Sequence, residues 1–242
     1  MASRGVALVT GAAQRIGRVL AVAAADSGFD VALHVRSISD NAESAAAEVR
    51  AKGRKATLLA CDLRQEAASV ALVSQAEAEL GVVTLLVNCA SVFEYDAFAD
   101  MNRASWDLHM ETNLRAPLVL SQAFARRLPT GREGQIVNIL DQRVLRPGSD
   151  FFSYTLSRTA LWDATRMLAQ ALAPRIRVNA IGPGPTLQST HQDAAAFAAE
   201  AAATPLARAV EPAEIGRALR YLIDAAAVTG QLIAVDSGQH LA

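Results

Sequence analysis

Short apolar runs alternate along this chain with longer segments whose apolar residues recur at helical spacing. The predicted strands are Val6–Thr10, Val31–Val35, Thr57–Ala60, Leu85–Asn88, Ile136–Ile139, Val178–Ile181 and Leu232–Val235. The predicted helices are Ile16–Ala25, Asn41–Ala51, Glu66–Leu80, Ser105–Leu128, Tyr154–Ala173 and Glu211–Ala225, with an alanine-rich helix at Ala194–Ala203. Because the strand runs are continuously apolar, both faces of the sheet should be covered. The pattern predicts one α/β domain with a parallel sheet, right-handed crossovers and helices on both faces.

Composition narrows the class of protein. The 242 residues fit one α/β domain, 52% of them are hydrophobic, and the net charge of −1 argues against nucleic-acid binding. No apolar run reaches the roughly 18 residues that a membrane span needs. Met1–Gly5 leads straight into the first strand, which leaves no room for a signal peptide. Cys61 and Cys89 lack metal-ligand spacing, so we expect reduced thiols, no metal site and a cytoplasmic protein.

The segment Thr10–Gly17 follows the first strand and opens the first helix. Gly11 permits a tight turn, and Gly17 permits close packing of helix against strand. The free N–H groups of the new helix would then face a pyrophosphate. In a βαβ unit this turn predicts a nucleotide site, the alternative being an ordinary strand-to-helix turn.

The end of the second strand bears on which dinucleotide binds. An NAD site usually has an acidic residue here for the ribose 2′-hydroxyl, but this chain has none before Asp40. Arg36 and Ser37, which follow His34 and Val35, offer a guanidinium and a hydroxyl suited to a 2′-phosphate. With Arg15 as a second charge, the pattern favours NADP(H), unless Arg36 is only a solvated loop cation.

A carboxylate, a phenol and a guanidinium are spaced so that they can meet in one site. Asp141 ends the strand-like run Gln135–Leu140, Tyr154 comes thirteen positions later, and Arg158 four after that. Residues four apart on a helix share one face. An acid, a phenol and a fixed positive charge are the parts of a proton-delivery site, although such Tyr and Arg pairs also occur on helix surfaces.

A series of motifs in one order makes the chain resemble the classical short-chain dehydrogenase/reductase family over nearly its full length. They are the Thr10–Gly17 turn, Asp62, Asn88–Ala90, Asn113, Tyr154 and the pair Pro183–Gly184. The resemblance implies a single NADP-binding Rossmann domain over 1–242, with a doubly wound seven-stranded parallel sheet. It also implies a homo-oligomer, either a tetramer or a dimer, that acts on a small-molecule substrate.

The same resemblance assigns roles to individual residues. Asp62 and Leu63 would bind the adenine end, with Gly11 and Ile16 at the phosphates, Asn88 and Ala90 along the adenosine ribose, and Pro183 and Gly184 beside the nicotinamide. Asn113 would hold a water in a proton relay that includes Tyr154. Two simpler interpretations remain open: Asp62 as a helix N-cap, and Asn113 as a buried amide bound by backbone.

The chain departs from the general family at three positions. Arg15 stands where a glycine is usual, Asp141 where the catalytic serine is usual, and Arg158 where the lysine is usual. In the first two departures the chain is similar to one branch of the family, the pteridine reductases and the dihydromonapterin- and dihydrofolate-reducing members. That branch also has a pattern like His34–Ser37. Arg158 matches neither, and we expect it to alter activity without abolishing it, because Arg and Lys are not interchangeable.

That branch also has counterparts of Ser91 and Phe93, and its phenylalanine stacks on the pterin. Stacking of a flat heterocycle on Phe93 is physically sound, the alternative being a loop aromatic that caps the core. The predicted substrate-binding residues are therefore Arg15, Ser91, Phe93, Asp141 and Tyr154.

The most favoured function is NADPH-dependent reduction of a C=N bond in a pteridine or dihydrofolate-like ring. Reduction of another substrate, such as a ketone or quinone, and cofactor binding without catalysis are the alternatives. A lid is expected over about 184–205, since a long segment after a late strand lies at the carboxyl edge of the sheet. Among further candidates for the pocket, Phe151 and Phe152 stay open, Trp162 is better explained by interface packing, and His191 by a solvated loop.

Overall fold

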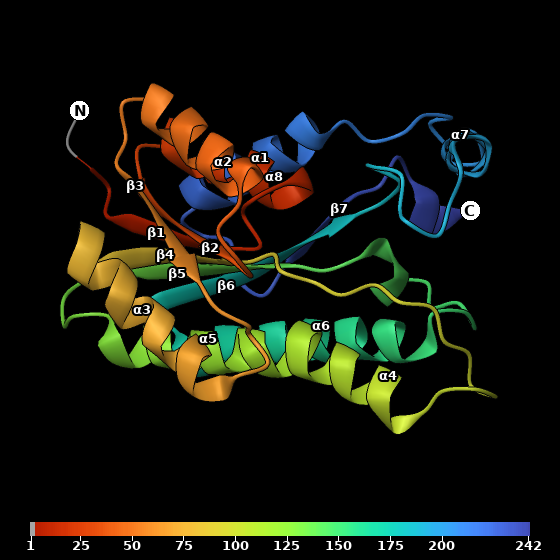
Figure 1. The fold of residues 1–242 in the computed structure, drawn as a ribbon, viewed down its shortest axis with the longest axis horizontal. Coiled ribbons are helices and arrows are strands. Elements are labelled where there is room, and N and C mark those ends of the chain that lie inside the picture. Colours follow the sequence, from red (N-terminus) through yellow and green to blue (C-terminus); the bar gives the residue numbers. More distant parts are fainter. Residues whose placement is uncertain (1–2) are drawn as a thin grey trace.

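Seven strands form one parallel sheet in the computed structural model, which describes residues 3–242 (Figure 1). The strand order is β3-β2-β1-β4-β5-β6-β7, so the chain moves outward from β1, returns to β4 beside β1, and continues to the other edge. The strands are β1 (Val6–Thr10), β2 (Asp30–Val35), β3 (Ala56–Ala60), β4 (Val83–Asn88), β5 (Gly134–Ile139), β6 (Ile176–Pro183) and β7 (Leu232–Val235). The predicted doubly wound sheet is confirmed, and ligands of such sheets bind where the order reverses.

Helices cover both faces of the sheet (Figure 1). On one face lie α1 (Arg15–Asp26), α2 (Asp40–Ala51) and α8 (Pro212–Asp224), and on the other lie α3 (Glu66–Leu80), α5 (Ala116–Arg127) and α6 (Phe152–Leu172). The helix α4 (Arg103–His109) precedes α5, and α7 (Ala194–Ala202) stands beyond the end of β7 near the carboxyl edge of the sheet. Short 3₁₀ turns at Gln142–Val144 and Gln239–Leu241 complete the structure.

The central strands are buried over their whole length, which explains their continuous apolar pattern. Every residue of β1 and β4 is buried. Leu8 and Leu86 are fully buried in the apolar layer beneath α3 and α5, whereas Leu33 lies in the layer beneath α1 and α8. Burial of one such side chain contributes about 1.5–3 kcal/mol, so these two layers hold the sheet rigid and fix the positions of its strand ends.

The predicted single helix Ser105–Leu128 is wrong in one respect. Between α4 and α5, Met110–Arg115 forms a π-helical segment. The buried amide of Asn113 lies in this segment, where its Oδ1 accepts from the Val92 N–H and its Nδ2 donates to the Val92 carbonyl, both at 2.9 Å. A π-turn inserts a residue into the helix and often occurs at functional sites. Here it lets a helix hold the loop that follows β4.

Candidate active site

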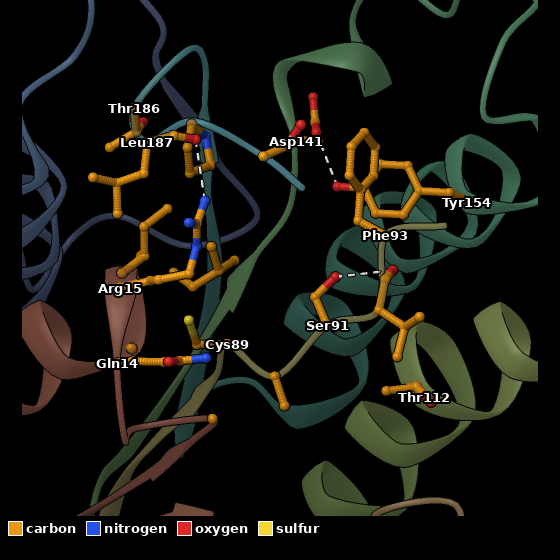
Figure 2. Close-up of a pocket in the computed structure, with 18 of the residues that line it drawn as sticks. Gln14, Arg15, Cys89, Ser91, Phe93, Thr112, Asp141, Tyr154, Thr186 and Leu187 are labelled. Carbon is orange, nitrogen blue, oxygen red and sulfur yellow. Dashed lines mark hydrogen bonds between the residues drawn. The ribbon is translucent and has the colours of Figure 1, made fainter. Parts of the chain in front are cut away.

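A cavity of about 1090 Å³ opens at the carboxyl ends of the strands, around the point where the strand order reverses. Figure 2 shows part of its wall, with the glycine-rich turn on one side and Phe93 and Tyr154 on the other. Most residues expected from the sequence line it, namely Gly11, Arg15, Ile16, His34, Arg36, Ser37, Asp62, Leu63, Ala90, Ser91, Phe93, Asp141, Tyr154, Arg158, Pro183 and Gly184. Two do not: Asn88 and Asn113 lie outside the wall.

The side chains of Asn88 and Asn113 are engaged within the protein. The Asn88 Nδ2 donates to Oδ1 of Asn138 at 2.8 Å across neighbouring strands, while its own Oδ1 has no partner within residues 3–242. Binding of the adenosine ribose by Asn88 stays a prediction. The Asn113 side chain is held by the Val92 backbone, as the simpler interpretation expected, and also lies 3.3 Å from the Ser157 hydroxyl. A relay role for Asn113 stays a prediction.

The glycine-rich turn requires both of its glycines. Gly11 has φ +67°, in the left-handed region. A Cβ on Gly17 would lie 2.0 Å from the Gly11 carbonyl oxygen, so only glycine allows the first turn of α1 to pack this closely. The buried Thr10 hydroxyl accepts from the N–H groups of Cys89 and Ala90 at 2.9 and 3.0 Å, and this ties the turn to the end of β4.

His34 joins three strands at the floor of the cavity. Its Nδ1 accepts from the Gly11 N–H at 3.3 Å, so Nε2 carries the proton and donates to the Cys61 carbonyl at 3.2 Å. Burial lowers the pKa of His34, so the ring stays neutral at pH 7. The structure therefore shows His34 as a support for the glycine-rich turn.

The far end of the cavity is rich in charge. Arg36 and Ser37 are exposed at the end of β2. The carboxylate of Asp62 pairs with Arg64, and this partner lowers the pKa of Asp62 to about 2. The alternative that Asp62 caps a helix is wrong, because the N-cap position of α3 is Gln65. Arg64 lines the cavity and was missed by the sequence pattern, which gave no reason to single out one loop arginine.

A hydrogen bond joins the two residues expected to handle the proton (Figure 2). The Tyr154 hydroxyl donates to Oδ2 of Asp141 at 2.9 Å, and the Arg143 N–H donates to Oδ1 at 2.9 Å. Asp141 ends the segment after β5 and Tyr154 lies in the first turn of α6, as the spacing predicted. Burial raises the pKa of Asp141, and burial together with the Asp141 charge raises the pKa of Tyr154.

Arg158 lies beneath this pair, one helical turn beyond Tyr154. It is only 3% exposed, and its guanidinium carbon lies 5.4 Å from the centre of the Tyr154 ring. Nη1 donates to the Ile139 carbonyl at 3.2 Å, while Nε has no hydrogen-bond partner within residues 3–242. A buried cation at this position opposes the rise in the Tyr154 pKa, and its Nε–H is buried without a partner in the described part of the chain.

Aromatic side chains surround Phe93. Its ring stacks on Phe151 with centroids 4.1 Å apart and 10° between the planes, and it meets the Tyr154 ring in a T-shaped contact with centroids 4.7 Å apart. His191 Nε2 lies 2.9 Å from the Phe93 carbonyl oxygen, so His191 is not merely a solvated loop residue. Phe151 and His191 line the cavity, whereas Phe152 and Trp162 do not. Phe151 has φ +50°, a conformation that sequence alone does not reveal for a phenylalanine.

The segment after β6 lies over the cavity, where the lid was expected. Arg15 reaches across to it and donates to the carbonyl oxygen of Leu187 at 3.1 Å (Figure 2). It also donates to the carbonyl oxygen of Gln188 at 3.0 Å. Gln192 in turn donates to Glu200 on α7 at 2.5 Å. The glycine-rich turn and the cover are thus linked directly through Arg15, which was expected only at the ligand. Movement of the segment 184–205 as a lid stays a prediction.

Comparison with known proteins defines the class. A model for the family described as enoyl-(acyl carrier protein) reductase matches residues 11–240, and it is a model of the short-chain dehydrogenase/reductase family. The chain belongs to this family and is an oxidoreductase of that type. The family uses nicotinamide cofactors.

Among its relatives, two solved structures are especially similar. The FolM alternative dihydrofolate reductase 1 of Brucella canis, complexed with NADP, is 45% identical with a TM-score of 0.95, covering 100% of this chain and 96% of that one. The corresponding Brucella suis protein, also with NADP, is 45% identical with the same score and covers 97% of that chain. By sequence, a 2-dehydro-3-deoxy-D-gluconate 5-dehydrogenase of Dickeya dadantii is 34% identical over 74% of this chain and 70% of its own length.

Proposed function

We propose that the protein is an NADPH-dependent reductase of a C=N bond in a dihydropteridine or dihydrofolate-like ring. The observation that carries the proposal is the hydrogen bond from Tyr154 to Asp141 at the cavity wall, next to the Phe93 ring. A serine at position 141 would suit a carbonyl oxygen, because a hydroxyl can donate to it. An ionised carboxylate only accepts hydrogen bonds, and it therefore suits the N–H groups of an amino-pyrimidine.

The residues present fit a bound NADPH. Gly11 and Gly17 let the turn pack closely against the chain just after β4 and the start of α1, whose first N–H groups lack partners within the helix, and the unpartnered Nε of Arg158 would be a donor for the nicotinamide ribose. Arg36 and Ser37, with Arg64 nearby in the wall, would hold the 2′-phosphate. When bound, the reduced nicotinamide supplies a hydride. The Brucella proteins that are 45% identical were crystallised with NADP, which supports the choice of cofactor.

At the substrate end, Phe93 provides a flat surface for a ring and Asp141 an acceptor for its N–H groups. The Asp141 carboxylate is already held by the Arg143 N–H, so its second oxygen is directed to Tyr154 and the cavity. The Phe93 ring is itself fixed by Phe151 on one side. Such fixed groups lower the cost of ordering the site when the ring binds.

Tyr154 supplies the proton. Its hydroxyl is protonated in the free protein, because burial and the Asp141 charge raise its pKa. When a ring nitrogen gains negative charge, the phenol gives up its proton, and the buried Arg158 beneath the ring stabilises the phenolate that forms. Asp141 keeps the phenol oriented and holds the heterocycle, and Tyr154 recovers a proton from solvent afterwards.

The test is a panel of substrates assayed with NADPH: dihydropteridines, dihydrofolate, ketones and quinones. The proposal expects turnover of the dihydropteridines, with Asp141→Ala and Tyr154→Phe each slowing it far more than they weaken NADPH binding. Turnover of ketones or quinones alone would contradict it in favour of a carbonyl or quinone reductase. Tight NADPH binding without turnover, restored by Arg158→Lys, would instead indicate a cofactor-binding protein with impaired catalysis.

A further inference from the structure

Three polar side chains outside the cavity wall form a buried network next to the proposed catalytic tyrosine. They are Asp96 in the loop after β4, His109 at the end of α4 and Ser153 in the first turn of α6, and we call them the His109 network. His109 and Ser153 are 0% exposed and Asp96 is 4% exposed. Burying a polar group costs free energy unless it is hydrogen-bonded, so such a network is stable only when all of its members have partners.

The hydrogen bonds of the network run in one direction. The Glu94 N–H donates to Nε2 of His109 at 3.2 Å, so the imidazole proton lies on Nδ1 and is donated to the Ser153 hydroxyl at 2.7 Å. The Ser153 hydroxyl in turn donates to Oδ2 of Asp96. Burial lowers the pKa of His109, which keeps the ring neutral and able to accept from Glu94. Each group thus has a partner, and the tautomer of His109 is determined.

The network also caps the helix that carries Tyr154. The N-cap residue of α6 is Phe151, whose side chain has no oxygen to accept the free N–H groups. Asp96 provides the cap from another part of the chain: its Oδ1 accepts from the Ser153 N–H at 2.9 Å, and its carbonyl accepts from the Phe152 N–H at 3.0 Å. The start of α6 is therefore held by the same loop that carries Phe93.

We propose that His109, Ser153 and Asp96 are positioning residues that set the distance between the stacking ring of Phe93 and the hydroxyl of Tyr154. The proposal rests on the proposed function for these two residues. Glu94 is adjacent to Phe93 and Ser153 is adjacent to Tyr154, so each end of the network holds the backbone next to one of them. A shift of the backbone at Glu94 or at Ser153 would change how a substrate ring stacked on Phe93 approaches the Tyr154 hydroxyl.

The experiment compares two buried serines. Ser153→Ala removes the central hydroxyl of the network, whereas Ser121→Ala removes an equally buried hydroxyl that donates to the Pro117 carbonyl within α5. Ser153→Ala should lose more thermal stability than Ser121→Ala, because it leaves the Nδ1–H of His109 and Oδ2 of Asp96 without their hydroxyl partner, so kcat is compared on the folded protein of each variant. Only Ser153→Ala should lower kcat for the dihydropteridine, by about 10- to 100-fold, since displacements near 1 Å have effects of this size. The Kd for NADPH should remain unchanged in both.

His109 allows a rescue. A glutamine side chain can accept from the Glu94 N–H and donate to the Ser153 hydroxyl, whereas leucine can do neither. We therefore expect a large fall in kcat for His109→Leu and only a small one for His109→Gln. The proposal would be overturned if the folded Ser153→Ala and His109→Leu variants had the wild-type kcat. It would also be overturned if Ser153→Ala and Ser121→Ala lowered kcat equally.

A second measurement needs no turnover, so its failure is distinct from failure of the proposed function. Imidazole ¹⁵N NMR should show Nδ1 of His109 protonated and Nε2 free. Amide hydrogen exchange at Glu94 and Ser153 should accelerate in His109→Leu and stay at the wild-type rate in Ser121→Ala. A proton on Nε2, or unchanged exchange in His109→Leu, would overturn the proposal even if the substrate proves to be a ketone.

Discussion

Asp141 and Tyr154 are the residues on which the chemistry depends, and their hydrogen bond constrains how activity varies with pH. In the structure both oxygens of Asp141 accept hydrogen bonds, which corresponds to the ionised carboxylate. Its neighbours include two cations, Arg143 and Arg158, which oppose the effect of burial but do not cancel it. An ionised Asp141 is required to bind the N–H groups of the ring, so its protonation should reduce activity.

The profile of kcat/KM against pH should therefore fall on the acid side. Because burial raises the pKa of Asp141, the fall should begin at a higher pH than for an ordinary carboxyl group. Asp141→Asn should lower kcat/KM by about 100-fold and remove this limb. A wild-type profile that stays flat below neutral pH, or an acid limb that survives in Asp141→Asn, would contradict the assignment.

Arg158 lends itself to a graded comparison at one position. Arg158→Met removes the charge beneath Tyr154 and the donor to Ile139, so we expect kcat to fall by about 100-fold or more. Arg158→Lys restores the charge, and its kcat should lie within about tenfold of the wild type, because the two cations differ in geometry and not in sign. Steady-state kinetics measure both. Equal kcat in wild type and Arg158→Met would remove this residue from the mechanism.

The first turn of α1 is the element that forms the phosphate end of the site. Gly17→Ala places a Cβ atom only 2.0 Å from the Gly11 carbonyl oxygen. The helix must move, at a cost of about 1–3 kcal/mol in the free energy of unfolding, and the N–H groups of the turn move with it. We expect the Kd for NADPH to rise at least tenfold, as measured by fluorescence titration.

Gly53→Ala is the control for that substitution. Gly53 has φ +73° with open space around it, so alanine there costs backbone strain of about 1–3 kcal/mol and no close contact. Both variants should unfold at lower temperature, but only Gly17→Ala should bind NADPH more weakly. If the two variants bind NADPH equally, the close packing at Gly17 is not what forms the phosphate site.

At the scale of the whole molecule, binding of the cofactor should stabilise the folded protein against unfolding. A ligand at 100 times its Kd adds about 2.7 kcal/mol, which raises the Tm of a domain of this size by about 5–10 °C. We expect NADPH to give this shift at a concentration where NADH gives much less, and Arg36→Ala to reduce the difference. Thermal denaturation with each cofactor measures it, and equal shifts in the wild type would indicate that the 2′-phosphate is not recognised.

Other predictions at this level remain untested. Within residues 3–242 none of the helices combines the length and apolarity needed to cross a membrane. A homo-oligomer and a cytoplasmic location stay predictions.

Much of the fold could be predicted because it depends on local pattern. Continuous apolar runs identified every strand, and the glycine-rich turn and the tip of β5 identified two walls of the cavity. The spacing from Asp141 to Tyr154 was enough to predict that the two side chains meet, because the end of a strand and the start of a helix are both rigid.

What sequence could not predict depends on contacts between distant residues. Ser153 bonds to Asp96, 57 positions away, and no periodicity records that contact. In the π-segment the Asn113 amide bonds to the Val92 backbone, 21 positions away, and Arg15 bonds to a segment more than 170 positions later.

The central claim is best tested by following the hydride. NADPH deuterated at the transferring position of the nicotinamide should be incubated with the protein and a dihydropteridine, and the product examined by mass spectrometry and NMR. The account predicts one deuterium on a carbon of the reduced ring, formed by the wild type and far more slowly by Asp141→Ala. A reduced ring without deuterium would contradict it, as would deuterium on the alcohol carbon of a ketone incubated in place of a pteridine that is not reduced.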